Sequence, residues 1–98
     1  MKLNFNFNLT DLDGKNLIER DGTAVNAGKL LANALVQQTK GDAIKFLEWA
    51  LSLNKGEIID LDTSDQETLK KFIESNESII VLAKGALLKV FTKVPDKK

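Results

Sequence analysis

Apolar and polar side chains alternate through the first nine residues of the chain. The apolar positions, separated by asparagines, are Leu3, Phe5, Phe7 and Leu9. Successive side chains of an extended chain point to opposite faces, so this pattern predicts a half-buried β-strand rather than a helix. An Asp-Gly pair follows at residues 13–14, where glycine readily takes a positive φ, and residues 16–19 supply a returning strand. The N-terminal segment is therefore predicted to form a β-hairpin.

Counting pairs back from the turn predicts the register of this hairpin. With a two-residue loop at the Asp-Gly pair, Leu9 faces Ile18, and the returning strand is too short to reach residues 3–6. Residues 3–6 then need another partner. Three alternatives remain open: the extended stretch 57–61 of the same chain, a neighbouring chain, or solvent.

Beyond the hairpin, the spacing of apolar residues changes to that of helices. Apolar residues recur every three or four positions, which predicts helices over about residues 24–38, 43–53, 64–75 and 77–92. The last segment starts with β-branched residues at positions 79–81, so a strand over residues 78–82 is the alternative there. We prefer the helix, because its apolar residues then share one face.

Capping signals and small residues refine these helices. Asp42 is a ready N-cap for the second helix, and Ser64 and Glu67 have the spacing of a capping box for the third. Gly28 and the alanines near it let a neighbouring backbone approach the first helix closely. The second helix has few polar positions, so we expect it to be the central helix of the domain or one side of an interface.

These elements predict an α+β fold. It has an N-terminal β-hairpin, with residues 57–61 as a candidate third short strand, packed on about four α-helices. A chain of 98 residues is long enough for one modest core, so we expect residues 1–98 to form a single small globular domain. Residues 94–98 are expected to be a frayed tail, because Pro95 does not continue a helix. No internal repeat is evident.

The composition gives no sign of catalysis or cofactor binding. The chain has 14 basic and 14 acidic residues, and it has neither cysteine nor histidine, which excludes disulfides, thiolate catalysis and the commonest metal ligands. An EF-hand loop around Gly14 would begin at Leu9 and end at Arg20, which cannot bind calcium. Turn formation explains Asp11 and Asp13 at the hairpin tip better than acid–base catalysis does. We therefore expect no enzyme activity, no cofactor and no metal site.

Two further segments are unevenly charged. Residues 57–77 are rich in acids, whereas residues 84–98 are rich in lysines. Complementary packing of the last two helices explains this difference. The alternative is a small nucleic-acid-binding regulator that contacts phosphates through Lys84, Lys89 and Lys93, although no arginine accompanies these lysines.

Several short strings resemble small uncharacterised phage and prophage proteins. They are FNLTDLDGK at residues 7–15, GKLLANAL at 28–35, KFLEWAL at 45–51 and KGE at 55–57. Some phage proteins of this size and type are tail-assembly chaperones or adaptors, and others belong to regulatory regions. The resemblance implies a phage-encoded assembly factor or adaptor, but it supplies no catalytic motif.

The sequence thus favours a non-catalytic protein–protein interaction or assembly module. Two surfaces are candidates for partner binding: a strand edge that adds a strand of the partner, and an apolar row on the last helix. The residues concerned are Leu3, Phe5 and Phe7 on the strand and Val81, Gly85 and Leu88 on the helix. The partner would be another protein or a second copy in a homodimer, whereas we expect no membrane or small-molecule ligand and disfavour nucleic acid. The start of the chain lacks the apolar run of a signal peptide, so we expect a cytoplasmic protein, located in the host cytoplasm if it is phage-encoded.

Overall fold

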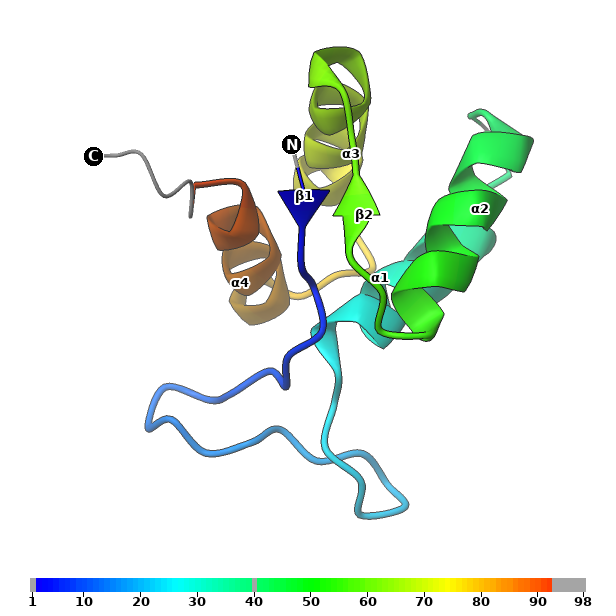
Figure 1. The fold of residues 1–98 in the computed structure, drawn as a ribbon. Coiled ribbons are helices and arrows are strands. Elements are labelled where there is room, and N and C mark those ends of the chain that lie inside the picture. The colour runs from blue at the N-terminus through cyan, green and yellow to red at the C-terminus, as the bar shows by residue number, and fades with distance from the viewer. Residues whose placement is uncertain (1, 40, 93–98) are drawn as a thin grey trace.

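The computed structural model describes residues 2–39 and 41–92 and has helices packed around the N-terminal segment (Figure 1). Its elements are β1 (Lys2–Leu3), α1 (Ala27–Val36), α2 (Ala43–Asn54), β2 (Ile59–Asp60), α3 (Thr63–Ser75) and α4 (Val81–Thr92). The predicted α+β class is confirmed, with four helices and a two-stranded antiparallel sheet in the described part of the chain. The expected frayed tail at residues 94–98 lies outside the described residues.

The first residues of the predicted strand pair with residues of the same chain. Lys2 lies opposite Asp60, and Leu3 lies opposite Ile59, so β1 and β2 lie side by side (Figure 1). This pairing places Leu3 and Phe5 in the core, where they are 1% and 0% exposed. Of the three open alternatives for residues 3–6, the structure has the pairing within the chain for Leu3 alone, and residues 4–6 lie outside the sheet.

The hairpin forms, but its loop contains three residues, 12–14, rather than the two predicted. Leu17 donates its backbone N–H to the carbonyl of Leu9 at 2.9 Å, so Leu9 faces Leu17 instead of Ile18. A shift of one residue exchanges the two faces of a strand. Accordingly, Leu17 is half-buried, whereas Ile18 is 59% exposed.

Asp11 explains the longer loop. Its Oδ1 accepts hydrogen bonds from the backbone N–H groups of Asp13 at 2.9 Å and Lys15 at 3.0 Å. Gly14 then takes a φ of 84°, the left-handed conformation that the last position of a three-residue hairpin loop requires. The side chain of Asp11 therefore favours the wider turn over the two-residue loop.

The next eight residues repeat this loop, so the expectation of no internal repeat is wrong. The N–H of Glu19 donates to the Thr23 carbonyl at 2.8 Å, as that of Asp11 does to Lys15 at 2.7 Å. Gly22 has a φ of 88° and takes the place of Gly14. Both loops extend from the helices on the same side of the molecule (Figure 1).

Backbone hydrogen bonds join the three arms of these loops into a ring. Leu9 donates to Val25 at 2.8 Å, Val25 donates to Leu17 at 2.9 Å, and Leu17 donates to Leu9. Because Val25 takes part in this ring, α1 begins at Ala27 with Asn26 as its N-cap, and the predicted start at residue 24 is wrong.

Gly28 allows the close approach that the sequence predicts. A Cβ atom at this position would lie 3.0 Å from the carbonyl oxygen of Leu53 and 3.2 Å from that of Phe5. Both neighbours are backbone atoms, which have little freedom to move away. Gly28 therefore lets α1 lie directly against the end of α2 and the N-terminal segment.

The ends of α3 and α4 differ from the predictions. Asp62, rather than Ser64, is the N-cap of α3, and its side chain accepts the N–H of Asp65 at 2.7 Å. Aspartate caps a helix as well as serine does, so the helix begins before the predicted capping box. Asn76 then forms a turn by accepting the N–H groups of residues 78 and 79, and α4 begins at Val81. A strand over residues 78–82 does not form.

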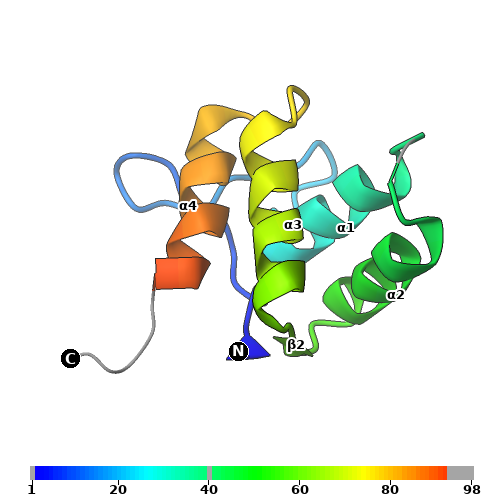
Figure 2. The ribbon, with the colours of Figure 1, turned by 90° about the horizontal axis from the view of Figure 1, so that it is seen from above.

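The helix α2 lies at the edge of the molecule and is not its central helix. Figure 2 shows α3 between α4 on one side and the α1–α2 pair on the other. Phe46 of α2 stacks on Trp49 and meets Phe72 of α3 edge-on, with ring centroids 5.7 and 5.6 Å apart. The opposite side of the helix pair exposes a set of apolar side chains that we name the α1–α2 face. It consists of Val36, Ile44, Leu47 and Leu51.

Candidate functional site

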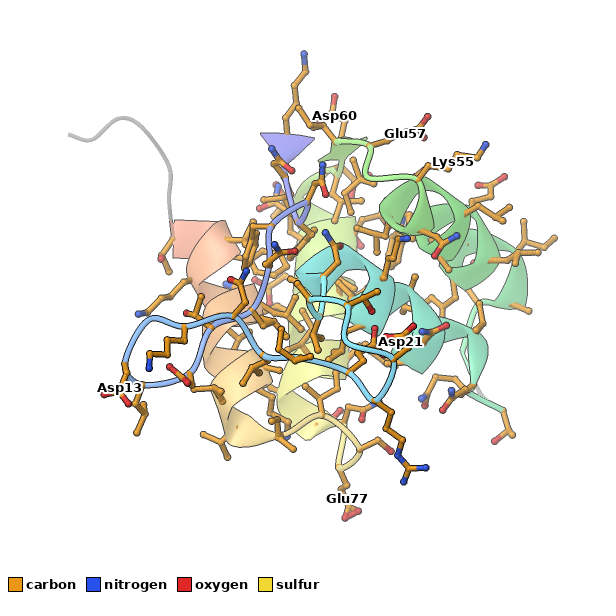
Figure 3. The ribbon with its side chains drawn as sticks, turned by 90° about the horizontal axis from the view of Figure 1, so that it is seen from below. Asp13, Asp21, Lys55, Glu57, Asp60 and Glu77 are labelled. Carbon is orange, nitrogen blue, oxygen red and sulfur yellow. The ribbon has the colours of Figure 1, made fainter. Side chains whose placement is uncertain are left out.

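An open groove of about 480 Å³ lies between the first loop of the hairpin and α4. One wall consists of residues 7–12, and the other consists of residues 81, 82, 85, 86 and 89 of α4. Figure 3 shows the first loop beside α4, with Asp13 at its outer tip pointing away from the helices. We refer to this feature as the α4 groove.

Packing beneath the α4 groove holds its two walls together. Leu9 of the first wall is buried, and so are Ala83 and Leu87 on the inner side of α4. Phe91, near the end of α4, meets Phe5 edge-on with ring centroids 6.0 Å apart. The ring of backbone hydrogen bonds through Leu9 fixes the loop side of the groove. Core contacts therefore position both walls and leave the groove open to solvent.

The rim of the α4 groove carries two strongly exposed apolar side chains. Leu12, at the start of the first loop, is 94% exposed, and Val81, at the start of α4, is 84% exposed. Single exposed apolar residues are common on protein surfaces, but these two line the same groove. Leu12 was not identified from the sequence as a candidate site residue. The signal was its position: an apolar residue between two aspartates of a turn has no turn-forming role.

Gly85 lies midway along α4 and also lines the groove. In the described part of the chain, no atom outside its own helix backbone and its sequence neighbours would lie within 4 Å of a Cβ atom at this position. This contrasts with Gly28, whose missing side chain makes room for two backbone carbonyls. Packing among the described residues therefore gives no reason for glycine at position 85.

The structure divides the residues expected to bind a partner through the strand. Leu3 and Phe5 are buried in the core, so their side chains contact the rest of this chain and not a partner. Phe7 is half-buried and lines the α4 groove. We therefore do not carry Leu3 and Phe5 forward as partner contacts.

The structure also divides the apolar row expected on the last helix. Val81 and Gly85 are exposed and line the α4 groove. Leu88 is half-buried and packs against the core instead. The fold thus brings Phe7, Val81 and Gly85 to one groove, although they lie far apart in the sequence.

The lysines of the nucleic-acid alternative do not act as one patch. The Lys84 ammonium donates to the backbone carbonyl of Glu74 at 3.1 Å, which ties α4 to α3. Lys89 is exposed and lines the α4 groove. Lys93 lies outside the described residues. Among the residues that the structure describes, no group of three potential ligands from His, Cys, Asp and Glu is placed to hold a metal ion.

A separate ion pair connects α2 to α3. The Lys45 ammonium donates to Asp65 Oδ1 at 2.7 Å and lies 6.0 Å from the centre of the Trp49 ring. This hydrogen bond is the main reason that the pKa of Lys45 is raised above its ordinary value, with the Asp42 and Asp62 carboxylates adding to it. Lys45 therefore forms its ion pair across helices, with Asp65 of α3.

A carboxylate in the second loop, that of Asp21, also has a shifted pKa. Asp21 Oδ1 accepts the hydroxyl of Thr23 at 2.7 Å and its backbone N–H at 3.0 Å. These bonds favour the carboxylate and lower the pKa of Asp21. Asp21 thus stabilises the turn of the second loop.

The ion pair of Lys45 predicts a loss of stability in alkali. A lysine whose pKa is higher in the folded state stabilises the fold below its unfolded pKa, near 10.5, and this stabilisation disappears as the pH rises through the folded pKa. The difference in free energy of unfolding between wild type and Lys45→Gln is expected to shrink as the pH rises through the pKa of Lys45 in the folded state. Urea unfolding at pH 7 and about pH 11.5 measures it. Lys55→Gln is the matched control, and a Lys45→Gln difference that stays constant with pH would contradict the prediction.

Comparisons with known proteins give no relative for this chain. No family model matches it, and neither a curated protein nor a solved structure matches it. None of the helices in residues 2–39 and 41–92 has the length and apolarity that crossing a membrane requires. The function is therefore inferred from the α4 groove itself.

Proposed function

We propose that this chain is a non-catalytic protein–protein interaction module, an adaptor or assembly factor, whose partner binds in the α4 groove. Gly85 is the observation that carries the proposal. A glycine inside a helix costs about 0.5–1 kcal/mol relative to alanine, and no described neighbour would meet a Cβ atom there. Close approach of a partner supplies the reason for glycine that internal packing lacks.

The rest of the α4 groove supports a protein partner. Leu12 and Val81 expose large apolar surfaces on its rim, and burying apolar surface is the main driving force for association. Lys89 adds a charge that orients a partner rather than driving its affinity. The groove is open to solvent, as expected for a surface that accepts part of another macromolecule.

Site-specific cross-linking tests this function. The chain carrying a photo-reactive benzoyl-phenylalanine in place of Leu12 is expressed in its native host and irradiated. We expect a discrete adduct that disappears when Gly85→Leu is added, because the new side chain fills the groove. Gly85→Leu has open space around its Cβ, so the variant is expected to remain folded.

The same photo-reactive residue at Ile44, on the α1–α2 face, is the matched control. Its adducts are expected to be unaffected by Gly85→Leu. The proposal fails if the Leu12 position gives no adduct, or if its adducts persist in the Gly85→Leu variant while circular dichroism shows a folded protein.

A further inference from the structure

We infer that the α4 groove takes an extended segment of the partner, which adds a strand alongside residues 8–11. This inference rests on the proposed function and specifies the occupant of the same site. One wall of the groove consists of six consecutive residues, 7–12. Residues 8–11 of this wall are extended, with β-bridges at residues 8 and 10. Consecutive side chains of an extended segment point to opposite faces, so a wall built from all of them is the backbone edge of that segment.

The backbone hydrogen bonds of residues 8–11 use one edge and leave the other open. Leu9 donates to Val25 and accepts from Leu17, and Asp11 donates to Lys15. On a strand, the N–H and C=O groups of alternate residues point to opposite edges. Those of Asn8 and Thr10 therefore face the other edge, and within residues 2–39 and 41–92 neither residue makes a hydrogen bond.

These open backbone groups distinguish between an extended and a helical occupant. A helix satisfies its own backbone, so a helix lying in the groove would cover the polar groups of Asn8 and Thr10 without pairing them. Burying an unpaired backbone donor or acceptor is costly. An added strand pairs these groups and places alternate side chains against α4.

The α4 wall indicates which side chains the segment carries. Gly85 leaves room for an apolar side chain, and Lys89 favours an acidic one. Four residues of a helix rise about 6 Å, and residues i and i+2 of a strand are about 6.8 Å apart. The expected segment therefore has an apolar residue and an acidic residue separated by one position.

A peptide selection tests the inference on the full chain. A library of random seven-residue peptides is selected on the wild-type protein, and the affinity of the enriched peptides is measured by calorimetry. We expect enrichment of the apolar-x-acidic pattern, and at least about tenfold weaker binding to Gly85→Leu and to Lys89→Glu, as for the loss of one good contact. Leu47→Glu, on the α1–α2 face, is the matched control and should bind like wild type.

Amide exchange distinguishes strand addition from other modes of binding. The bound peptide is expected to slow the exchange of the Asn8 and Thr10 amides, because they become hydrogen-bonded. Selection of no peptide, enrichment of apolar residues at helical spacing, or unchanged exchange at both amides would each overturn strand addition. Cross-links from position 12 that depend on Gly85 would still support the interaction function, so the two failures are distinguishable.

Discussion

Phe5→Ala is expected to lower the free energy of unfolding by about 3–5 kcal/mol, as for other buried phenylalanines. The Phe5 ring is completely buried and meets Phe91 edge-on, so its removal leaves a cavity between the N-terminal segment and α4. Domains of this size are stable by only about 5–15 kcal/mol. The variant should therefore unfold at much lower urea concentration, followed by circular dichroism.

Phe7→Ala is the matched control for this prediction. Phe7 is only half-buried, so its loss should destabilise the protein clearly less than the loss of Phe5. A loss below about 1 kcal/mol at Phe5 would contradict its place in the core. It would also revive the hypothesis that the side chain of Phe5 binds a partner.

The same substitution at two helical glycines is expected to have opposite effects. Gly28→Ala places a methyl group 3.0 Å from the Leu53 carbonyl oxygen, and such overpacking costs about 1–3 kcal/mol. Gly85→Ala meets no neighbour among the described residues and gains about 0.5–1 kcal/mol from helix propensity. Urea unfolding of both variants measures the two signs.

The Gly85 result bears directly on the proposed function. A more stable Gly85→Ala variant would mean that the fold does not need glycine at this position. Stabilisation by both variants would show that Gly28 does not hold a close backbone contact. Destabilisation by both would show that Gly85 has a role within the fold, and this would remove the main support for the α4 groove as a binding site.

Local patterns predicted most of the secondary structure. Helical spacing located each of the four helices in the described residues, and Asp42 was correctly identified as the N-cap of α2. Two boundaries failed where side chains compete for backbone groups. Asp11 widened the first turn, and Asp62 capped α3 ahead of Ser64. The repeated loop was also visible in the sequence, because Gly14 and Gly22 each follow an aspartate.

Part of the candidate site could also be predicted. Phe7, Val81 and Gly85 were identified from the alternation of the strand and the apolar row on the last helix, and they line the α4 groove. Leu3 and Phe5 belong to the same alternation but are buried. Periodicity shows which side chains share a face, but it does not show whether the chain itself covers that face.

The sequence by itself determined the elements of this protein, because helix spacing, strand alternation and capping act between residues close together in the chain. Only the tertiary structure decided that β1 pairs with β2, that α2 lies at the edge, and that residues 7–12 meet α4. These outcomes depend on which distant surfaces bury one another, and short-range patterns do not specify that choice. The α4 groove exists because segments from opposite ends of the chain pack side by side without covering Gly85.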